Sequence, residues 1–175
     1  MRLLLITGLP GTGKTTLARD LARRYGVPLL GKDLIKEPLL DVLGAGNAAH
    51  ARLLSDASFA VLFAVLRELL AADLDVIVEG NFRAGEHEPM LAAIPSLRLV
   101  QVLCRALEPA RLARLAQRRG ATTRHQGHGD VDMAASSQRS ADAFLQLPGE
   151  RLTFDSSETV DARQLDAIDR CWKSE

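Results

Sequence analysis

Continuous apolar runs alternate with helix-like patterns along the chain. Residues 3–6 are apolar without interruption, which is typical of a strand buried on both faces of a parallel sheet. Further strands are predicted at residues 27–30, 74–78, 97–104 and 151–155, and helices at 14–24, 33–44, 49–72, 109–119, 136–146 and 160–172. Strands that alternate with helices indicate an α/β fold, a parallel sheet with helices on both faces.

Three details of this pattern give sharper expectations. The helix over residues 49–72 is almost wholly apolar, so we expect it to be packed on more than one side. The helix that begins near Lys14 is expected to end at Tyr25, with Gly26 as the glycine that follows a helix C-terminus. Asp75 stands at the start of its strand, and we interpret it as a turn residue.

Length and composition fit one domain over residues 1–175. Lys plus Arg and Asp plus Glu number 22 each, so no overall field attracts nucleic acid or an anionic membrane. The first apolar run is too short for a signal peptide, and no run is long enough for a membrane span. Cys104 and Cys171 lie far apart, which favours a reducing cytosol over a disulfide scaffold. We therefore expect a cytoplasmic protein without a membrane partner, of undetermined oligomeric state.

The sequence carries a phosphate-binding loop at residues 8–15, which match G-x-x-x-x-G-K-[ST] at every fixed position. The glycines let backbone N–H groups converge on phosphate oxygens, and the helix that follows adds unpaired N–H donors. Lys14 would meet the β- and γ-phosphates, and the Thr15 hydroxyl would be a Mg²⁺ ligand. This predicts binding of ATP with Mg²⁺. The expected nucleotide-binding residues in and beside the loop are Gly8, Pro10, Gly11, Thr12, Gly13, Lys14, Thr15 and Thr16.

Asp33 follows the second predicted strand, at the edge of the sheet where open α/β folds bind ligands. There it could accept the proton of an attacking hydroxyl, as positioned carboxylates do in phosphoryl transfer, or hold Mg²⁺ through water. The alternative is an N-cap for a helix that starts at Leu34. The two roles do not exclude each other.

Glu79 ends the third predicted strand. An acid at the end of a buried apolar strand is the Walker B arrangement, which contacts Mg²⁺ or its waters. Asp is commoner at this position. The alternative role for Glu79 is an ion pair with Arg83 or with an arginine from a lid.

Arginines are concentrated between Cys104 and His125, in a chain that is neutral overall. Arg111, Arg114 and Arg118 are spaced three and four apart, so a helix would place them along one face. Arginine forks suit the oxygens of a transferred phosphoryl group, and a mobile segment could bring them in when ATP binds. We expect a lid at about residues 105–132. A solvated helix face is the alternative.

The four histidines carry weaker signals. His125 and His128, with Asp130 and Asp132 nearby, could be imagined as a metal site, but no third ligand has convincing spacing and a polar lid explains them. His50 and His87 have no evident partners, and we expect them to be structural or exposed.

Several segments together resemble the AAA_33-type P-loop kinases. These segments are residues 8–16, Lys32-Asp33-x-x-Lys36, Glu79-Gly80-Asn81-Phe82 and Arg124-His125-Gln126-Gly127-His128. The group is related to chloramphenicol phosphotransferase, zeta toxins and the polynucleotide 5′-kinase, and more distantly to adenylate, shikimate and gluconate kinases. The resemblance covers nearly the whole chain, although only the phosphate loop is sharply specific.

The resemblance implies a five-stranded parallel sheet in the order 2-3-1-4-5, with a helical lid between the fourth and fifth strands. It implies that Asp33 activates the acceptor hydroxyl and that residues 155–157 lie near the adenine. Glu79 in place of Asp, and Lys36 in place of the commoner Arg, are departures from the pattern. Arg118, Arg119 and Arg124 would contact ATP phosphates, and Lys36, Asn81 and Arg83 would face the acceptor.

These features predict an ATP-dependent kinase that transfers the γ-phosphate to a hydroxyl of a small molecule. One alternative is a 5′-hydroxyl polynucleotide kinase, which would need a basic groove with stacking aromatics. Aromatic residues form only 4% of the chain, and we do not expect a nucleic-acid partner. The other alternative is an NTPase or nucleotide-gated switch without an acceptor. The sequence does not name the acceptor.

Overall fold

The structure is a computed structural model that describes residues 1–44, 46–94, 97–120, 142–158 and 161–174, without the side chains of residues 118–120. The strands are β1 (Arg2–Thr7), β2 (Leu29–Gly31), β3 (Val76–Glu79), β4 (Arg98–Arg105) and β5 (Glu150–Asp155). The helices are α1 (Lys14–Tyr25), α2 (Lys32–Leu43), α3 (Ala48–Ala71), α4 (Glu88–Ala92), α5 (Glu108–Gly120) and α7 (Ala162–Lys173).

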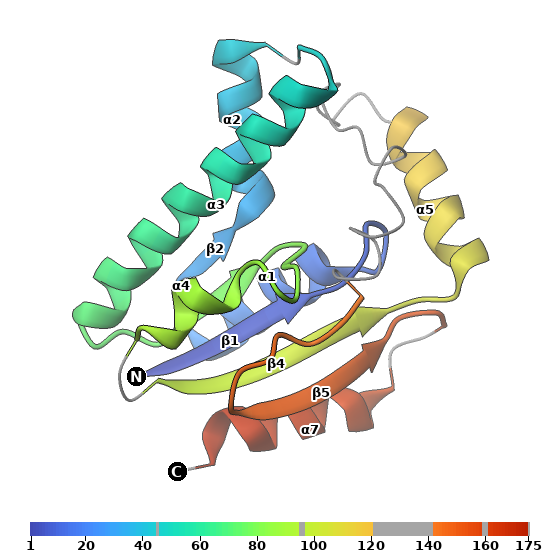
Figure 1. Cartoon of the computed structure of the whole chain (residues 1–175). Coiled ribbons are helices and arrows are strands. Elements are labelled where there is room, and N and C mark those ends of the chain that lie inside the picture. Colours follow the sequence, from blue (N-terminus) through green and yellow to red (C-terminus); the bar gives the residue numbers. More distant parts are fainter. Residues whose placement is uncertain (45, 95–96, 121–141, 159–160, 175) are drawn as a thin grey trace.

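The five strands form one parallel sheet in the order β2-β3-β1-β4-β5 (Figure 1). This order confirms the one that the sequence resemblance implied. Because all strands run the same way, their carboxyl ends meet at one edge, and the segments that follow β1, β2 and β3 are brought together there.

Helices cover both faces of the sheet. Leu3 and Leu5 of β1 pack in a core with α3 and α4, whereas Leu4 and Ile6 pack in a second core with α1 and α7. All four side chains are fully buried. The uninterrupted apolar run is therefore explained as predicted, by burial of alternate residues on opposite faces.

Helix α3 is packed on more than one side, as predicted, because it contacts helix α2 as well as strands β2 and β3 of the sheet. It is not covered all round, since Leu53, Val61 and Val65 are 64%, 45% and 40% exposed. The buried residues are Leu54, Ser58, Phe59, Leu62, Phe63, Leu66 and Leu70.

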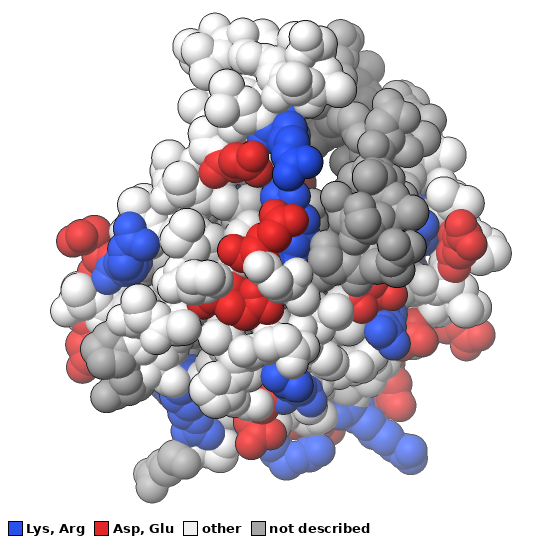
Figure 2. All heavy atoms as spheres, in the orientation of Figure 1, with Lys and Arg blue, Asp and Glu red and all other residues white. Residues whose placement is uncertain are grey.

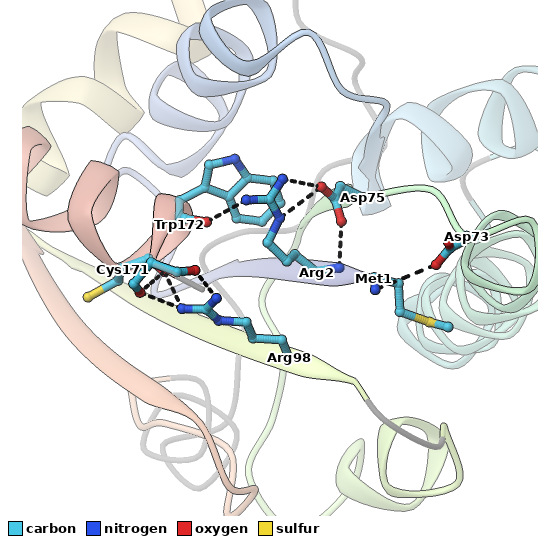
Figure 3. Close-up of polar contacts among 8 residues, drawn as sticks. Met1, Arg2, Asp73, Asp75, Arg98, Cys171 and Trp172 are labelled. Carbon is cyan, nitrogen blue, oxygen red and sulfur yellow. Dashed lines mark hydrogen bonds and ion pairs between the residues drawn. The ribbon is translucent and has the colours of Figure 1, made fainter.

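The amino edge of the sheet is held by charged side chains (Figure 3). The Arg2 guanidinium pairs with Asp75 at 2.6 Å and lies 4.9 Å from the centre of the Trp172 ring in α7. Asp75 also accepts a hydrogen bond from the backbone N–H of Arg2 at 2.6 Å. Its interpretation as a turn residue is therefore corrected, since Asp75 joins the starts of β1 and β3.

Two further elements differ from the sequence pattern. Helix α4 was not predicted, and residues 142–146, expected to end a helix over 136–146, form a turn and bends; residues 136–141 lie outside the described part. Gly26 has φ of 67° and its N–H donates to the carbonyl of Ala22, as expected for the end of α1. No helix in the described ranges is long and apolar enough to cross a membrane.

Candidate functional site

Residues 8–15, the phosphate loop, connect β1 to α1 at the carboxyl edge of the sheet. Gly8 has φ of 137°, and a Cβ there would lie 2.2 Å from the carbonyl oxygen of Cys104, so glycine alone fits. Gly13, which precedes α1, has φ of 81°, and no described side chain caps this helix end. The first N–H groups of α1 therefore face the loop, where the helix dipole favours an anion.

Three cationic side chains contact the loop backbone. Lys14 belongs to α1, and Arg111 and Arg114 belong to one face of α5, as their spacing predicted. In this arrangement the charges of α5 stand beside the phosphate loop rather than on a fully solvated helix face. The hydrogen bonds run from Lys14 Nζ to Leu9 O (3.0 Å), from Arg111 Nη1 to Pro10 O (3.4 Å) and from Arg114 Nη1 to Gly11 O (3.3 Å).

Ser156, in the segment after β5, joins three parts of the site. Its buried hydroxyl donates to the carbonyl of Thr12 at 2.9 Å and accepts from Arg114 Nη1 at 2.9 Å. Its backbone N–H donates to the carbonyl of Arg105 at 2.9 Å. The loop after β5 therefore lies against the phosphate loop. The sequence offered no sign that this serine, rather than its neighbours, makes these contacts.

Glu79 lies where β1, β2 and β3 end side by side. In the sheet it is paired with Ile6 on one side and Gly31 on the other. Its Oε2 accepts a hydrogen bond from the Thr15 hydroxyl at 3.2 Å. Glu79 makes no ion pair with Arg83 among the described contacts, so the expected alternative pairing with that arginine is wrong.

The carboxyl of Glu79 is almost completely buried, with 4% of the residue exposed. This burial raises the pKa of Glu79, and the charge of Asp33 raises it further. The charge of Lys14 and the Thr15 hydrogen bond act in the opposite direction. The carboxylate is therefore held in a place that favours its neutral form unless a cation is nearby.

Asp33 stands in the first turn of α2, directly beyond β2. The helix begins at Lys32 with Gly31 as its N-cap, so the alternative that Asp33 caps a helix starting at Leu34 is wrong. The Asp33 carboxylate is 51% exposed and lies 3.3 Å from Lys32 Nζ. Its charge is close enough to Glu79 to affect the pKa of that residue. Asp33 and Glu79 therefore share one edge of the site.

The three residues expected on the acceptor side follow β2 and β3. Lys36 is buried on α2, one turn after the buried Lys32. Asn81 is half-buried in the loop after β3. Arg83 is buried and pairs with Asp56 of α3 at 3.3 Å and with Glu86 at 3.1 Å; we refer below to Lys32, Lys36 and Arg83 as the buried cations.

His87 packs inside an aromatic cluster with Phe59, Phe63 and Phe82. Its Nδ1 accepts a hydrogen bond from the backbone N–H of Arg83 at 2.8 Å. Burial, with a further contribution from Arg83, lowers the pKa of His87 to about 4. It is therefore a neutral, structural histidine at physiological pH, in line with the expectation for this residue.

The remaining predicted residues are less fully described. Thr16 is exposed on α1. Arg118 and Arg119 lie in the last turn of α5, but their side chains are outside the described part. Arg124 and the histidine–aspartate group at residues 125–132 also lie outside it. No group of three His, Cys, Asp or Glu side chains that could hold a metal ion occurs in the ranges described.

A cavity of about 210 Å³ opens beside the phosphate loop, next to the β4–α5 junction. Arg105 and Asp142 form an ion pair of 3.4 Å across its lining. The cavity continues the site away from Asp33 and towards β5, the side on which the resemblance places the adenine. It is lined by Leu9, Thr12, Arg105, Ala106 and Asp142.

Comparisons with known proteins agree with this geometry. The profile of the AAA_33 family, described as an AAA domain, matches residues 3–141. No curated protein matches the chain.

Solved structures share the fold over nearly the full length. A protein of Chloroflexus aurantiacus J-10-fl, provisionally described as a kinase, is 29% identical with a TM-score of 0.85 over 97% of this chain and 96% of its own. A sugar kinase of Janibacter sp. HTCC2649 is 16% identical with a TM-score of 0.60, over 98% of this chain and 94% of its own. The Mycobacterium tuberculosis APS kinase CysC, solved with AMPPNP and APS, is 21% identical with a TM-score of 0.56, over 99% of this chain and 98% of its own. The fold is that of the P-loop kinases.

Proposed function

This chain belongs to the AAA_33 family of AAA domains, and we propose that it is an ATP-dependent kinase that phosphorylates a hydroxyl of a small molecule. The single observation that carries the proposal is the meeting of three groups at one edge of the sheet. These are the Thr15 hydroxyl and the buried carboxylate of Glu79, 3.2 Å apart, with the carboxylate of Asp33 at the neighbouring strand end.

The phosphate loop would hold the nucleotide. Gly8, Gly11 and Gly13 have positive φ, the loop leads into the uncapped N-terminus of α1, and Lys14 lies at that end. In the bound state Lys14, Arg111 and Arg114 would exchange their loop carbonyl partners for phosphate oxygens, which accept charge-assisted hydrogen bonds. The fold neighbour solved with AMPPNP supports ATP as the donor.

The residues present fit Mg²⁺. A threonine hydroxyl and a carboxylate are oxygen ligands, which this ion prefers, and Thr15 Oγ1 lies 3.2 Å from Glu79 Oε2. Thr15 would bind the ion directly, and Glu79 would hold it or its waters. When bound, Mg²⁺ would neutralise charge on the β- and γ-phosphate oxygens.

Asp33 would act as the base. Its half-exposed carboxylate can meet an acceptor that enters from solvent, and Lys32 at 3.3 Å holds it at the end of β2. The acceptor oxygen would form a bond to the γ-phosphorus as the bond to the β–γ bridging oxygen breaks. The acceptor proton would pass to Asp33, and ADP would leave with the bridging oxygen.

Arginines of α5 and the segment after it would stabilise the transferred group. Arg111 and Arg114 already stand at the phosphate loop. Arg118, Arg119 and Arg124 follow along the chain and remain proposed phosphate contacts. Lys36, Asn81 and Arg83 would face the acceptor.

An acceptor panel tests the proposal. The protein is incubated with Mg²⁺ and ATP, and ADP release is measured with and without each of a set of hydroxylated metabolites, nucleosides and aminoglycosides. Release that depends on one class of acceptor, and that is lost in both Lys14→Ala and Asp33→Asn, is the expected result. Release that ignores every acceptor and survives Asp33→Asn would overturn the kinase assignment in favour of an NTPase.

A further inference from the structure

The acceptor side of the site contains an unusual distribution of charge. The three buried cations have little contact with solvent: Lys32 is 6% exposed, and Lys36 and Arg83 are each 8% exposed. The carboxylates that pair with two of them are about half exposed: Asp33 at 51% with Lys32, and Asp56 at 52% and Glu86 at 47% with Arg83. These three cations are thus fixed inside, while the three carboxylates that pair with Lys32 and Arg83 lie at the rim. Figure 2, in the orientation of Figure 1, shows basic and acidic side chains interleaved down the middle of the face towards the viewer, below α2.

Burial of a cation is costly unless anionic or polar groups surround it. Exposed carboxylates are poor permanent partners, because water can replace the cation as their partner at little cost. Asp56 and Glu86 can therefore withdraw into solvent, whereas the buried guanidinium of Arg83 cannot. Such an arrangement leaves Asp56 and Glu86 as replaceable partners of Arg83.

Arg83 supplies a second, independent observation. Its Nε is buried and has no hydrogen-bond acceptor among the described residues, although both of its terminal nitrogens are paired. An unsatisfied buried N–H is rare in folded proteins and calls for an acceptor atom from elsewhere. The guanidinium is held at this place by its ion pairs with Asp56 and Glu86, and the backbone N–H of Arg83 donates to Nδ1 of the buried His87 at 2.8 Å.

The contacts connect Arg83 to Asp33. Arg83 pairs with Asp56, which stands on α3 one turn before Phe59. The Phe59 ring lies 6.0 Å from Lys32 Nζ, and Lys32 pairs with Asp33. Gly80 lets Lys32 and Phe59 lie close together, since a Cβ at residue 80 would lie 3.1 Å from the Cβ of Lys32. The guanidinium is therefore on the same side of the site as the proposed base.

We infer that the acceptor is an anionic alcohol, a small molecule whose carboxylate or phosphate binds Arg83 among the buried cations while its hydroxyl meets Asp33. The anion would accept from Arg83 Nε and displace Glu86 or Asp56 towards solvent. The inference rests on the proposed kinase function and names the substrate class for the same site.

The test uses acceptors matched in carbon skeleton and different in charge. Glycerol, glycerate, glycerol 3-phosphate and serinol form one series; glucose, gluconate, glucose 6-phosphate and glucosamine form a second. Binding to protein saturated with Mg²⁺ and AMPPNP is measured by calorimetry, and ADP release is measured with ATP. Tighter binding of the anionic member in at least one series is expected, and the carboxylate and phosphate arms separate the two sources of charge. Preference for the neutral or amino member in both series, or no binding of any anion, would overturn the inference.

Three variants make the assignment specific. Arg83→Gln should raise the KM for the anionic acceptor roughly tenfold to hundredfold, since a charge-assisted contact is lost. Glu86→Gln removes a competing carboxylate at the rim and should lower that KM severalfold, a gain that misfolding cannot produce. Arg67→Gln, at an exposed arginine of α3, is the matched control and should leave the KM for the anionic acceptor unchanged. An unchanged or higher KM in Glu86→Gln together with an unchanged KM in Arg83→Gln would contradict the inference. Acceptor-dependent ADP release with neutral acceptors alone would leave the kinase proposal standing and remove this one.

Discussion

The Thr15 hydroxyl and the Glu79 carboxylate lie 3.2 Å apart, and their hydrogen bond joins the start of α1 to the end of β3. The carboxylate is buried, and its burial raises the pKa of Glu79. Such a group destabilises the free protein whenever it is ionised. Its presence at this position is explained if a cation joins the two oxygens during function.

Replacement of Glu79 by Gln should stabilise the free protein and weaken nucleotide binding. A raised pKa means that the Glu79 contribution to stability is complete below the usual glutamate pKa and is lost as pH rises through the folded-state value. At pH 7.5 we expect Glu79→Gln to gain about 1 kcal/mol, or about 2–4 °C in melting temperature for a chain of this size. The gain should vanish near pH 4.

Calorimetric unfolding with and without Mg²⁺ and AMPPNP measures both effects. Stabilisation by the nucleotide complex should be smaller in Glu79→Gln than in the wild type. Glu68→Gln, at an exposed acid of α3, serves as the control. A destabilised Glu79→Gln that still binds Mg²⁺ and AMPPNP normally would argue against the assignment.

His87 should make the fold sensitive to acid. Burial lowers the pKa of this histidine to about 4, whereas in the unfolded chain it is near 6.5. The histidine contribution is thus present above pH 6.5 and is lost as pH falls towards 4, by about 2 kcal/mol between pH 6.5 and 5. His87→Asn keeps an acceptor for the Arg83 N–H but cannot titrate. Urea unfolding across this pH range should show a flatter profile for the variant, even if its maximum is lower; parallel profiles would contradict the role given to His87.

Gly8 and Gly26 form a matched pair for the phosphate loop. Both have positive φ, but a Cβ at Gly8 would lie 2.2 Å from the Cys104 carbonyl oxygen, whereas no atom lies within 4 Å of one at Gly26. Gly26→Ala should therefore cost only the backbone strain, about 1 kcal/mol, and leave nucleotide binding intact. Gly8→Ala should cost several times as much and abolish the binding of AMPPNP in calorimetry. Equal effects of the two changes would mean that the close approach at Gly8 is not a constraint.

Ser156 should support the phosphate loop through its hydroxyl. Ser156→Ala leaves the Thr12 carbonyl without this donor and Arg114 without this acceptor, so we expect a loss of about 1–3 kcal/mol in stability and a rise in the Kd for AMPPNP on the order of tenfold. Ser157 is the natural control, because its hydroxyl contacts Asp155 and Leu107 rather than the loop. Ser157→Ala should reduce stability without weakening the binding of AMPPNP. The same change in the Kd for AMPPNP in both variants would contradict the proposed support of the phosphate loop by Ser156.

Much of this arrangement was predictable from local sequence. The fixed residues of the phosphate loop have steric and electrostatic reasons that act over short distances, and the spacing of Arg111 and Arg114 places both on the face of α5 that meets the loop. The strand order followed from the resemblance. Short parallel strands that alternate with helices would have left several orders open.

Contacts between distant segments were not predictable. Ser156 meets Thr12 across 144 residues of chain, and Arg2 meets Asp75 across 73. The type of a single polar residue does not indicate which distant residue it will contact. The burial of Lys32, Lys36 and Arg83 was equally hidden, since lysine and arginine are usually exposed and composition alone suggests a solvated surface.

The central claim is that Asp33 and the phosphate loop transfer the γ-phosphate to a hydroxyl, and a single-turnover experiment tests it most directly. Enzyme in excess over γ-³²P-labelled ATP is mixed with Mg²⁺ and the best acceptor, and label is followed into the acceptor and into inorganic phosphate. The account predicts label in the acceptor, a rate about 10²- to 10⁴-fold lower in Asp33→Asn, and an unchanged Kd for AMPPNP in that variant. Label found only in inorganic phosphate, at the same rate with and without Asp33, would contradict it.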